Sequence, residues 1–277
     1  MKKTFDALTM KKMDNDSKIG ILAVMGNDGY PHAAFINTIM PINENTLVWS
    51  QFLQGLTKRL LPEQKNAAFL ALTPEKDVFR GKAVYDHEET DGEIFDLYNS
   101  RPRFRYNSYF GIEKVHIMDL KYILEPEVLK TGDIIKGAVS SRLAAGSLKN
   151  TGNIMNSITC FLFGQMDSLK FIVYEDNDGF PWIIPCIQAV PGGKGSIVFS
   201  LKPYGEELKK IPQGVKVAIY CANMKLQCVM VKGTFKGIDK KRGVTCGVID
   251  VEKVYNPLPP TPGYIYPKEP IKKITEF

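Results

Sequence analysis

The chain has 277 residues, which corresponds to two domains at about 150 residues per domain. Hydrophobic residues make up 44% of the sequence and charged residues 24%, proportions that exclude intrinsic disorder over most of the chain. The net charge of +6 is too small for a typical nucleic-acid-binding surface, and it mildly favours small anionic ligands such as phosphates.

The N-terminus and the cysteines predict a cytoplasmic protein. Met1-Lys2-Lys3 resembles the start of a signal peptide, but further charged residues up to Lys18 leave no apolar segment behind it. No stretch has the roughly 18 uninterrupted apolar residues of a membrane-spanning helix. The cysteines form no C-x-x-C pair, which predicts reduced, buried thiols rather than disulfides or a zinc site. They are Cys160, Cys186, Cys221, Cys228 and Cys246.

Residues 1–125 predict a short helical segment followed by six strands. The helical segment covers residues 4–18, and an apolar strand over 19–25 leads into Asp28-Gly29. This dipeptide predicts a tight hairpin, because a type I′ turn requires positive φ at both central residues. The elements that follow are strands over 32–39 and 46–50, a basic helix over 56–61, and strands over 67–72, around Gly81 and over 114–118. Short strands with Gly and Pro turns are typical of a small antiparallel β-barrel.

The same pattern recurs about 150 residues later, which predicts two copies of one domain. The matching pairs are Asn27–Pro31 with Asn177–Pro181, Val48–Ser50 with Val198–Ser200, and Val78–Lys82 with Met230–Thr234. Residues 126–255 form the second copy, and helices between residues 134 and 163 form its N-terminal segment. Residues 256–277 are rich in proline and predict an extended arm of polyproline II type. The arm is either a solvated tail or a segment that docks on a neighbouring domain or subunit.

The order of these elements resembles the flavin mononucleotide (FMN)-binding split barrels related to pyridoxamine 5′-phosphate oxidase. The resembling stretches are Ile19–Gly81 and Leu169–Gly233. The resemblance implies a mainly β fold of two tandem split β-barrels with flanking helices. In this family two barrels pair with the cofactor at their interface, so the pair would form either within the chain or in a homodimer.

The resemblance also implies a cofactor site in the first copy. A Ser/Thr and Arg/Lys group after the third strand holds the flavin phosphate in the family, and the corresponding residues here are Ser50, Thr57, Lys58 and Arg59. Charge-assisted donors and a helix N-terminus suit a phosphate dianion. The isoalloxazine edge would lie beside residues 35–38 and 48–50, which include Asn37 and Trp49. The alternative for the basic residues is a solvated helix start, and the alternative for Trp49 is core packing.

Some features depart from the family. Residues 32–39 contain no Arg or Lys, although pyridoxamine 5′-phosphate oxidases carry basic residues in this strand, so that specific activity is not expected. In the second copy, Glu206 and Glu207 would repel a phosphate, so the first copy is expected to hold the cofactor. His87 and His116 have no companion at metal-ligand spacing, and the sequence identifies no catalytic residue.

A basic and aromatic cluster over Arg101–Phe110 leaves three interpretations open. It could bind single-stranded nucleic acid, close over an anionic ligand, or be a loop whose arginines stack on its own aromatic rings. For the whole chain, the hypothesis is an FMN-dependent oxidoreductase that takes a small-molecule substrate and an electron donor. The alternatives are a non-catalytic flavin- or haem-binding module on the same fold and a nucleic-acid-binding β-barrel.

Overall fold

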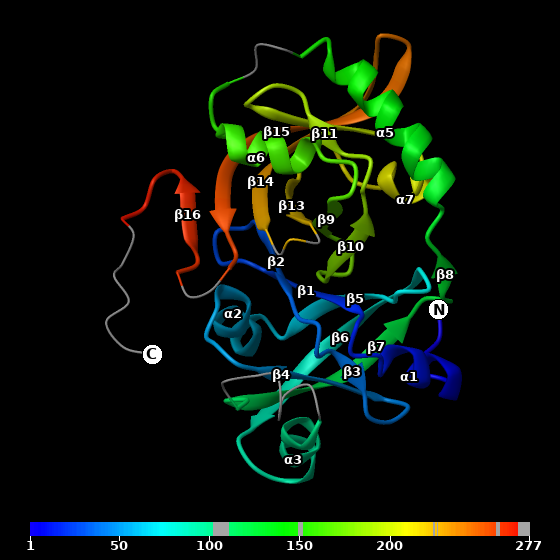
Figure 1. Cartoon of the computed structure of the whole chain (residues 1–277), viewed down its shortest axis with the longest axis vertical. Coiled ribbons are helices and arrows are strands. Elements are labelled where there is room, and N and C mark those ends of the chain that lie inside the picture. Colours follow the sequence, from blue (N-terminus) through cyan, green and yellow to red (C-terminus); the bar gives the residue numbers. More distant parts are fainter. Residues whose placement is uncertain (102–110, 149–151, 224, 226, 259–260, 271–277) are drawn as a thin grey trace. The chain divides into compact units, whose positions relative to one another are not determined.

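Two sheets of eight strands each form the framework of the chain (Figure 1). The structure is a computed structural model that describes all residues except 102–110, 149–151, 224, 226, 259–260 and 271–277. The chain divides into two units. The first comprises Met1–Gly26, Ala33–Leu129 and Gly179–Pro181, and the second comprises Asn27–His32, Lys130–Asp178 and Trp182–Phe277.

The first sheet has the strand order β2-β1-β5-β6-β7-β4-β3, and β8 pairs with β6. Its strands are β1 (Ile19–Met25), β2 (Pro31–Phe35), β3 (Met40–Pro41), β4 (Thr46–Gln51), β5 (Asn66–Leu72), β6 (Asp77–Glu89), β7 (Lys114–Ile123) and β8 (Glu127–Val128). The helices of the same part of the chain are α1 (Ala7–Met13), α2 (Leu56–Gln64) and α3 (Glu93–Ser100).

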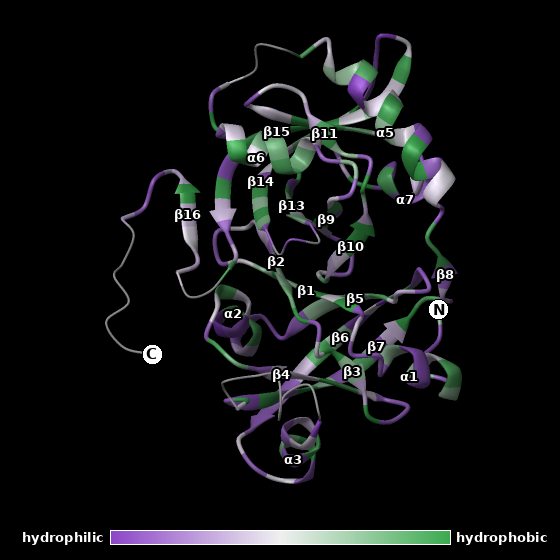
Figure 2. Cartoon of the chain, in the orientation of Figure 1, coloured by the Kyte–Doolittle hydropathy of each residue, from purple (hydrophilic) through white to green (hydrophobic). Residues whose placement is uncertain are grey.

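The second sheet repeats this order as β10-β9-β13-β14-β15-β12-β11, and β16 pairs with β15. Its strands are β9 (Leu169–Glu175), β10 (Pro181–Pro185), β11 (Val190–Pro191), β12 (Ser196–Ser200), β13 (Lys216–Ala222), β14 (Cys228–Lys241), β15 (Val244–Asn256) and β16 (Gly263–Tyr266). Its helices are α5 (Thr131–Ala145), α6 (Ser157–Gly164) and α7 (Gly205–Leu208). Figure 2 shows α6 as a mostly hydrophobic helix, and its Leu162 and Phe163 are buried.

The predicted mainly β fold with flanking helices is confirmed, and the two sheets agree in detail as a tandem duplication requires. The helices that precede them have equivalent caps: Asp6 accepts a hydrogen bond from the Thr9 backbone N–H, and Asn156 accepts one from Thr159, both at 2.8 Å. Such side-chain caps satisfy backbone donors that the first helical turn leaves free.

The repeated glycines of β6 and β14 have a structural reason. A Cβ atom on Gly81 would lie 2.4 Å from the Tyr122 carbonyl oxygen, and one on Gly233 would lie 2.0 Å from that of Asp250. Both positions are next to a break in strand register. Glycine therefore allows the neighbouring strand to approach closely at the point where each long strand bends.

Two sequence predictions about secondary structure were wrong. The strand expected over residues 32–39 ends at Phe35, and the chain turns with a hydrogen bond from the Ile39 N–H to the Ile36 carbonyl. The expected polyproline II arm contains strand β16, which pairs with β15. Pro262 and Pro267 flank this strand, so the four residues between them keep the N–H donors that sheet pairing requires.

Candidate functional site

The segment from the end of β4 to the start of α2 contains most of the predicted site residues. Ser50 lies near the end of β4, and Thr57, Lys58 and Arg59 lie in the first turn of α2. The N-cap residue Gly55 makes no side-chain cap, and the first turn contains no acidic residue. Because helix N-termini carry partial positive charge, two added cations destabilise this turn unless an anion lies close to it. The turn is therefore suited to an anionic ligand.

Two hydroxyl groups in this segment are buried without a partner. Neither Ser50 Oγ nor Thr57 Oγ1 has a hydrogen-bond partner in the part of the chain that the structure describes. The two residues are 3% and 1% exposed, respectively. A buried polar group without a hydrogen bond costs about 1–3 kcal/mol. A ligand with oxygen acceptors would remove this cost for both groups.

The two basic residues differ in their surroundings. Lys58 is partly buried and donates a hydrogen bond from Nζ to the Leu53 carbonyl. Desolvation lowers the pKa of Lys58 to about 8, and the negative charge of Glu113 opposes this shift. Arg59 is exposed, and its guanidinium group forms no hydrogen bond or ion pair with any described residue. Both cations are thus available for an anion.

Trp49 lies on the opposite face of β4 from Ser50, in the core of the first barrel. Its ring stacks on His116 at a centroid distance of 3.9 Å and an interplanar angle of 11°. The fully buried Trp49 ring therefore packs in the core, and it does not share the face of β4 on which the Ser50 hydroxyl lies.

His116 is a polar core residue that sequence reasoning did not connect with this segment. Its Nε2 lies 2.9 Å from Gln51 Oε1. Desolvation lowers the pKa of His116 to about 3, with further contributions from the positive charges of Lys58 and Lys114. The imidazole is therefore neutral near pH 7. No local pattern could have revealed this pair, because Gln51 and His116 are 65 positions apart in the sequence.

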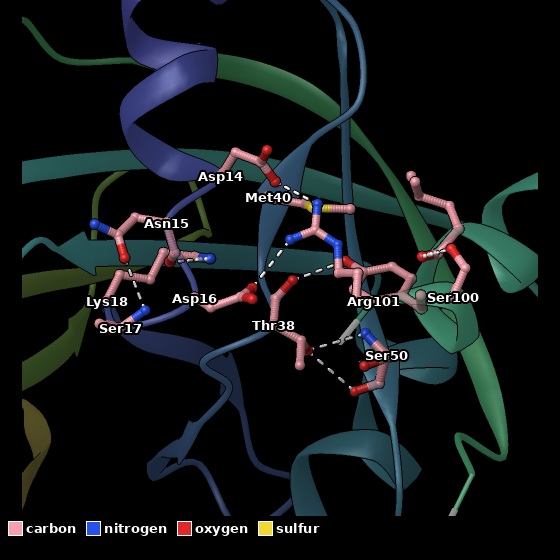
Figure 3. A network of polar contacts seen from close by, with 12 residues as sticks. Asp14, Asn15, Asp16, Ser17, Lys18, Thr38, Met40, Ser50, Ser100 and Arg101 are labelled. Atoms are coloured by element: carbon pink, nitrogen blue, oxygen red, sulfur yellow. Dashed lines mark hydrogen bonds and ion pairs between the residues drawn. The ribbon is translucent and has the colours of Figure 1, made fainter. Parts of the chain in front are cut away.

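Thr38 joins the two segments that were expected to flank the flavin ring. Its Oγ1 accepts a hydrogen bond from the Ser50 N–H at 3.1 Å and donates one to the Ser50 carbonyl at 3.3 Å (Figure 3). The structure therefore brings the end of the 35–38 segment to Ser50. Asn37 is partly exposed in the turn beside Thr38.

The equivalent position in the second unit is filled by protein. Ser200 Oγ donates a hydrogen bond to the Gly137 carbonyl at 2.9 Å, and the Ser200 N–H donates one to Ser141 Oγ at 2.8 Å. Both partners belong to α5, which packs on β12. The first turn of α7 carries Glu206 and Glu207. The second unit therefore has a paired serine hydroxyl and a negatively charged helix start. At the equivalent place, the first unit has a serine hydroxyl with no partner among the described residues and a positively charged helix start.

Arg101 is the only residue of the predicted basic and aromatic cluster within the described part of the chain, because residues 102–110 lie outside it. Its guanidinium group forms ion pairs with Asp14 and Asp16, the latter at 3.0 Å (Figure 3). Its charge is thus compensated inside the first unit. Its guanidinium carbon also lies 5.9 Å from the centre of the ring of Tyr98, a residue of α3 outside the cluster. The three interpretations of the cluster stay predictions.

Within the described ranges, no group of three or more His, Cys, Asp or Glu side chains is arranged to hold a metal ion. None of the described helices combines the length and the apolar character needed to cross a membrane.

Solved structures of several proteins are similar to one half of the chain. An FMN-binding protein from Syntrophomonas wolfei is 19% identical, with 44% of this chain and 84% of that chain covered at a TM-score of 0.38. A Lactobacillus delbrueckii protein named for pyridoxamine 5′-phosphate oxidase is 13% identical, covering 44% and 95% at 0.36. General stress protein 26 from Bacillus anthracis is 16% identical, covering 44% and 94% at 0.33. No protein-family model matches the sequence, and no curated protein matches it.

Proposed function

We propose that the first unit binds FMN and that the chain is a flavin-dependent oxidoreductase acting on a small molecule. The observation that supports this proposal best is the pair of hydroxyls without a partner among the described residues, Ser50 and Thr57, in the segment that leads from the end of β4 into the uncapped and cationic start of α2. A phosphate group would accept hydrogen bonds from both hydroxyls and compensate the charges of Lys58 and Arg59. The sequence resemblance implies that the phosphate-bearing ligand is FMN.

The residues of the first unit would bind and orient this ligand. FMN supplies the redox chemistry when bound. Ser50, Thr57, Lys58 and Arg59 would hold its phosphate, and the two hydrogen bonds between Thr38 and Ser50 would fix the end of β4 beside it. The neutral imidazole of His116 adds no charge to the core in which it stacks on Trp49.

The test is a visible absorption titration of the full chain with FMN, with two serine variants as a matched pair. We expect one FMN per chain. Ser50→Ala should weaken binding by about tenfold or more, because a hydrogen bond to a charged group contributes about 1.5–3 kcal/mol. Ser200→Ala should leave the affinity unchanged, because this hydroxyl is bonded to Gly137. Two FMN per chain, or equal effects of the two variants, would contradict the assignment to the first unit.

The affinity for FMN should also depend on pH through Lys58. The pKa of this residue is about 8 in the free protein, and a bound phosphate raises it because it stabilises the ammonium form. Binding above pH 8 then requires proton uptake, so the affinity is highest below pH 8. It should fall as the pH rises, by up to about tenfold per pH unit.

This pH dependence can be measured by titrating FMN at constant ionic strength between pH 7 and 9.5. Lys58→Arg is the control variant, because a guanidinium group stays charged throughout this range. The decrease in affinity above pH 8 should be much smaller in this variant. An equal decrease in both proteins would show that another group is responsible.

A further inference from the structure

We infer that Tyr98 positions the Ser50 hydroxyl for its ligand, acting through Thr38 and supported by Arg101. This inference rests on the proposed function, because it assigns Tyr98 a role in the same binding site. Tyr98 does not contact the ligand in this role. It fixes the backbone segment that in turn fixes Ser50.

A continuous chain of hydrogen bonds connects the three residues. The Tyr98 hydroxyl donates to the Thr38 carbonyl at 2.7 Å. The Thr38 side chain then bonds to both the N–H and the carbonyl of Ser50, at 3.1 and 3.3 Å. Figure 3 shows Thr38 between Ser50 and the segment that carries Arg101. The backbone of Ser50 is therefore held on both sides while its hydroxyl has no partner among the described residues.

The hydrogen bonds of Ser200 in the second unit, where no ligand is expected, can be compared with those of Ser50. Gln188 occupies the position equivalent to Thr38 and donates to the Ser200 carbonyl at 3.0 Å. Ser141 of α5 accepts from the Ser200 N–H, and Gly137 accepts from the Ser200 hydroxyl. Both units thus hold the backbone of this serine, but only the second supplies a partner for its hydroxyl in the described part of the chain. The hydrogen bonds from Tyr98 and Thr38 therefore position a Ser50 hydroxyl that can bond to a ligand.

Arg101 holds the element that carries Tyr98. Tyr98 is the only fully buried residue of α3, and the partly buried Ile94 and Phe95 pack with it against a hydrophobic cluster of the first unit. Directly after the helix, the Arg101 guanidinium group pairs with Asp14 and Asp16, which follow α1. These ion pairs fix the C-terminal end of α3 and thereby the hydroxyl of Tyr98. A displacement of α3 would be transmitted to Ser50 through Thr38.

The test is a double-mutant cycle between Tyr98→Phe and Ser50→Ala, with the dissociation constant of FMN measured for all four proteins. Removal of the Tyr98 hydroxyl should weaken FMN binding by about fivefold when Ser50 is present. In the Ser50→Ala background the same substitution should change binding by less than about twofold, because the hydroxyl that it positions is gone. Thr38→Val, which removes the next link, should show the same dependence on Ser50.

Tyr220→Phe is the matched control. Tyr220 is an equally buried tyrosine of the second unit, so its variant reports a general loss of stability, measured by urea unfolding without FMN. Tyr220→Phe should leave FMN binding unchanged.

An equal effect of Tyr98→Phe with and without Ser50 would overturn the positioning role while the proposed function stands. The absence of FMN binding by the unmodified chain would overturn both, and an unchanged affinity in Ser50→Ala would overturn the positioning role and the assignment of Ser50.

Discussion

Replacing Lys58 and Arg59 together by alanine is expected to weaken FMN binding by about a hundredfold or more. Each charge-assisted hydrogen bond to a phosphate contributes about 1.5–3 kcal/mol, and each 1.4 kcal/mol corresponds to about a factor of ten in affinity. The substitution also leaves the uncapped N-terminus of α2 as the main remaining source of positive potential. The dissociation constant can be measured by quenching of flavin fluorescence.

The matched control is Lys209→Ala with Lys210→Ala in the second unit. These residues follow α7 directly, and Lys209 pairs with Glu206 at the surface. Removing these two charges lowers the net charge of the chain as much as removing those of Lys58 and Arg59. The control therefore separates long-range attraction of FMN by the whole chain from direct contact with its phosphate. We expect the control to bind FMN like the unmodified chain. Equal affinities of the two double variants would place the phosphate elsewhere.

Gly137→Ala is expected to lower the free energy of unfolding by about 1–3 kcal/mol, the range of an overpacked buried position. A Cβ atom at this position would lie 2.0 Å from the Lys202 carbonyl oxygen and 3.1 Å from the Cβ of Gln188. Because the first of these contacts is with backbone, α5 must move away from β12. This movement also weakens the hydrogen bond between Ser200 and the Gly137 carbonyl. Urea unfolding followed by circular dichroism measures the effect.

Gly132→Ala in the same helix should have an effect of the opposite sign. A Cβ atom on Gly132 would meet no atom of the described residues within 4 Å, so the substitution brings only the better helix propensity of alanine, up to about 1 kcal/mol. The two variants thus change the same residue type in one helix and differ only in their surroundings. A similar stability for both would show that α5 is not tightly packed at Gly137.

The sequence predicted the strands well because residues that are neighbours in the chain determine most of each strand. Apolar runs, Asp-Gly turns and the repeat predicted β4 and β12 within one residue of their observed ends. The prediction that the second strand continues to residue 39 was wrong because the apolar run continues while the backbone turns after Phe35. Helix α3 was not predicted, because its charged and apolar residues span only two turns.

The candidate site was predictable only where its residues are adjacent in the chain. Thr57, Lys58 and Arg59 were predicted from one short motif, and the structure places them in one helical turn. The contacts of Tyr98 with Thr38 and of His116 with Gln51 join positions 60 and 65 residues apart. Only the folding of segments distant in the sequence brings these pairs together, so neither composition nor spacing indicated them. The difference between Ser50 and Ser200 likewise depends on α5, whose packing on β12 has no signature in the sequence.

This difference between Ser50 and Ser200 has a consequence for how the protein can evolve. In an assembly of two identical chains, every substitution is introduced into both copies at once, so neither copy can change alone. Here the two copies are encoded separately in one polypeptide, and each can accumulate its own substitutions. In the second copy, the serine hydroxyl donates to the Gly137 carbonyl and the serine N–H donates to Ser141, both on α5. In the first copy, the serine hydroxyl has no partner among the described residues, an asymmetry that a gene for a single barrel could not encode.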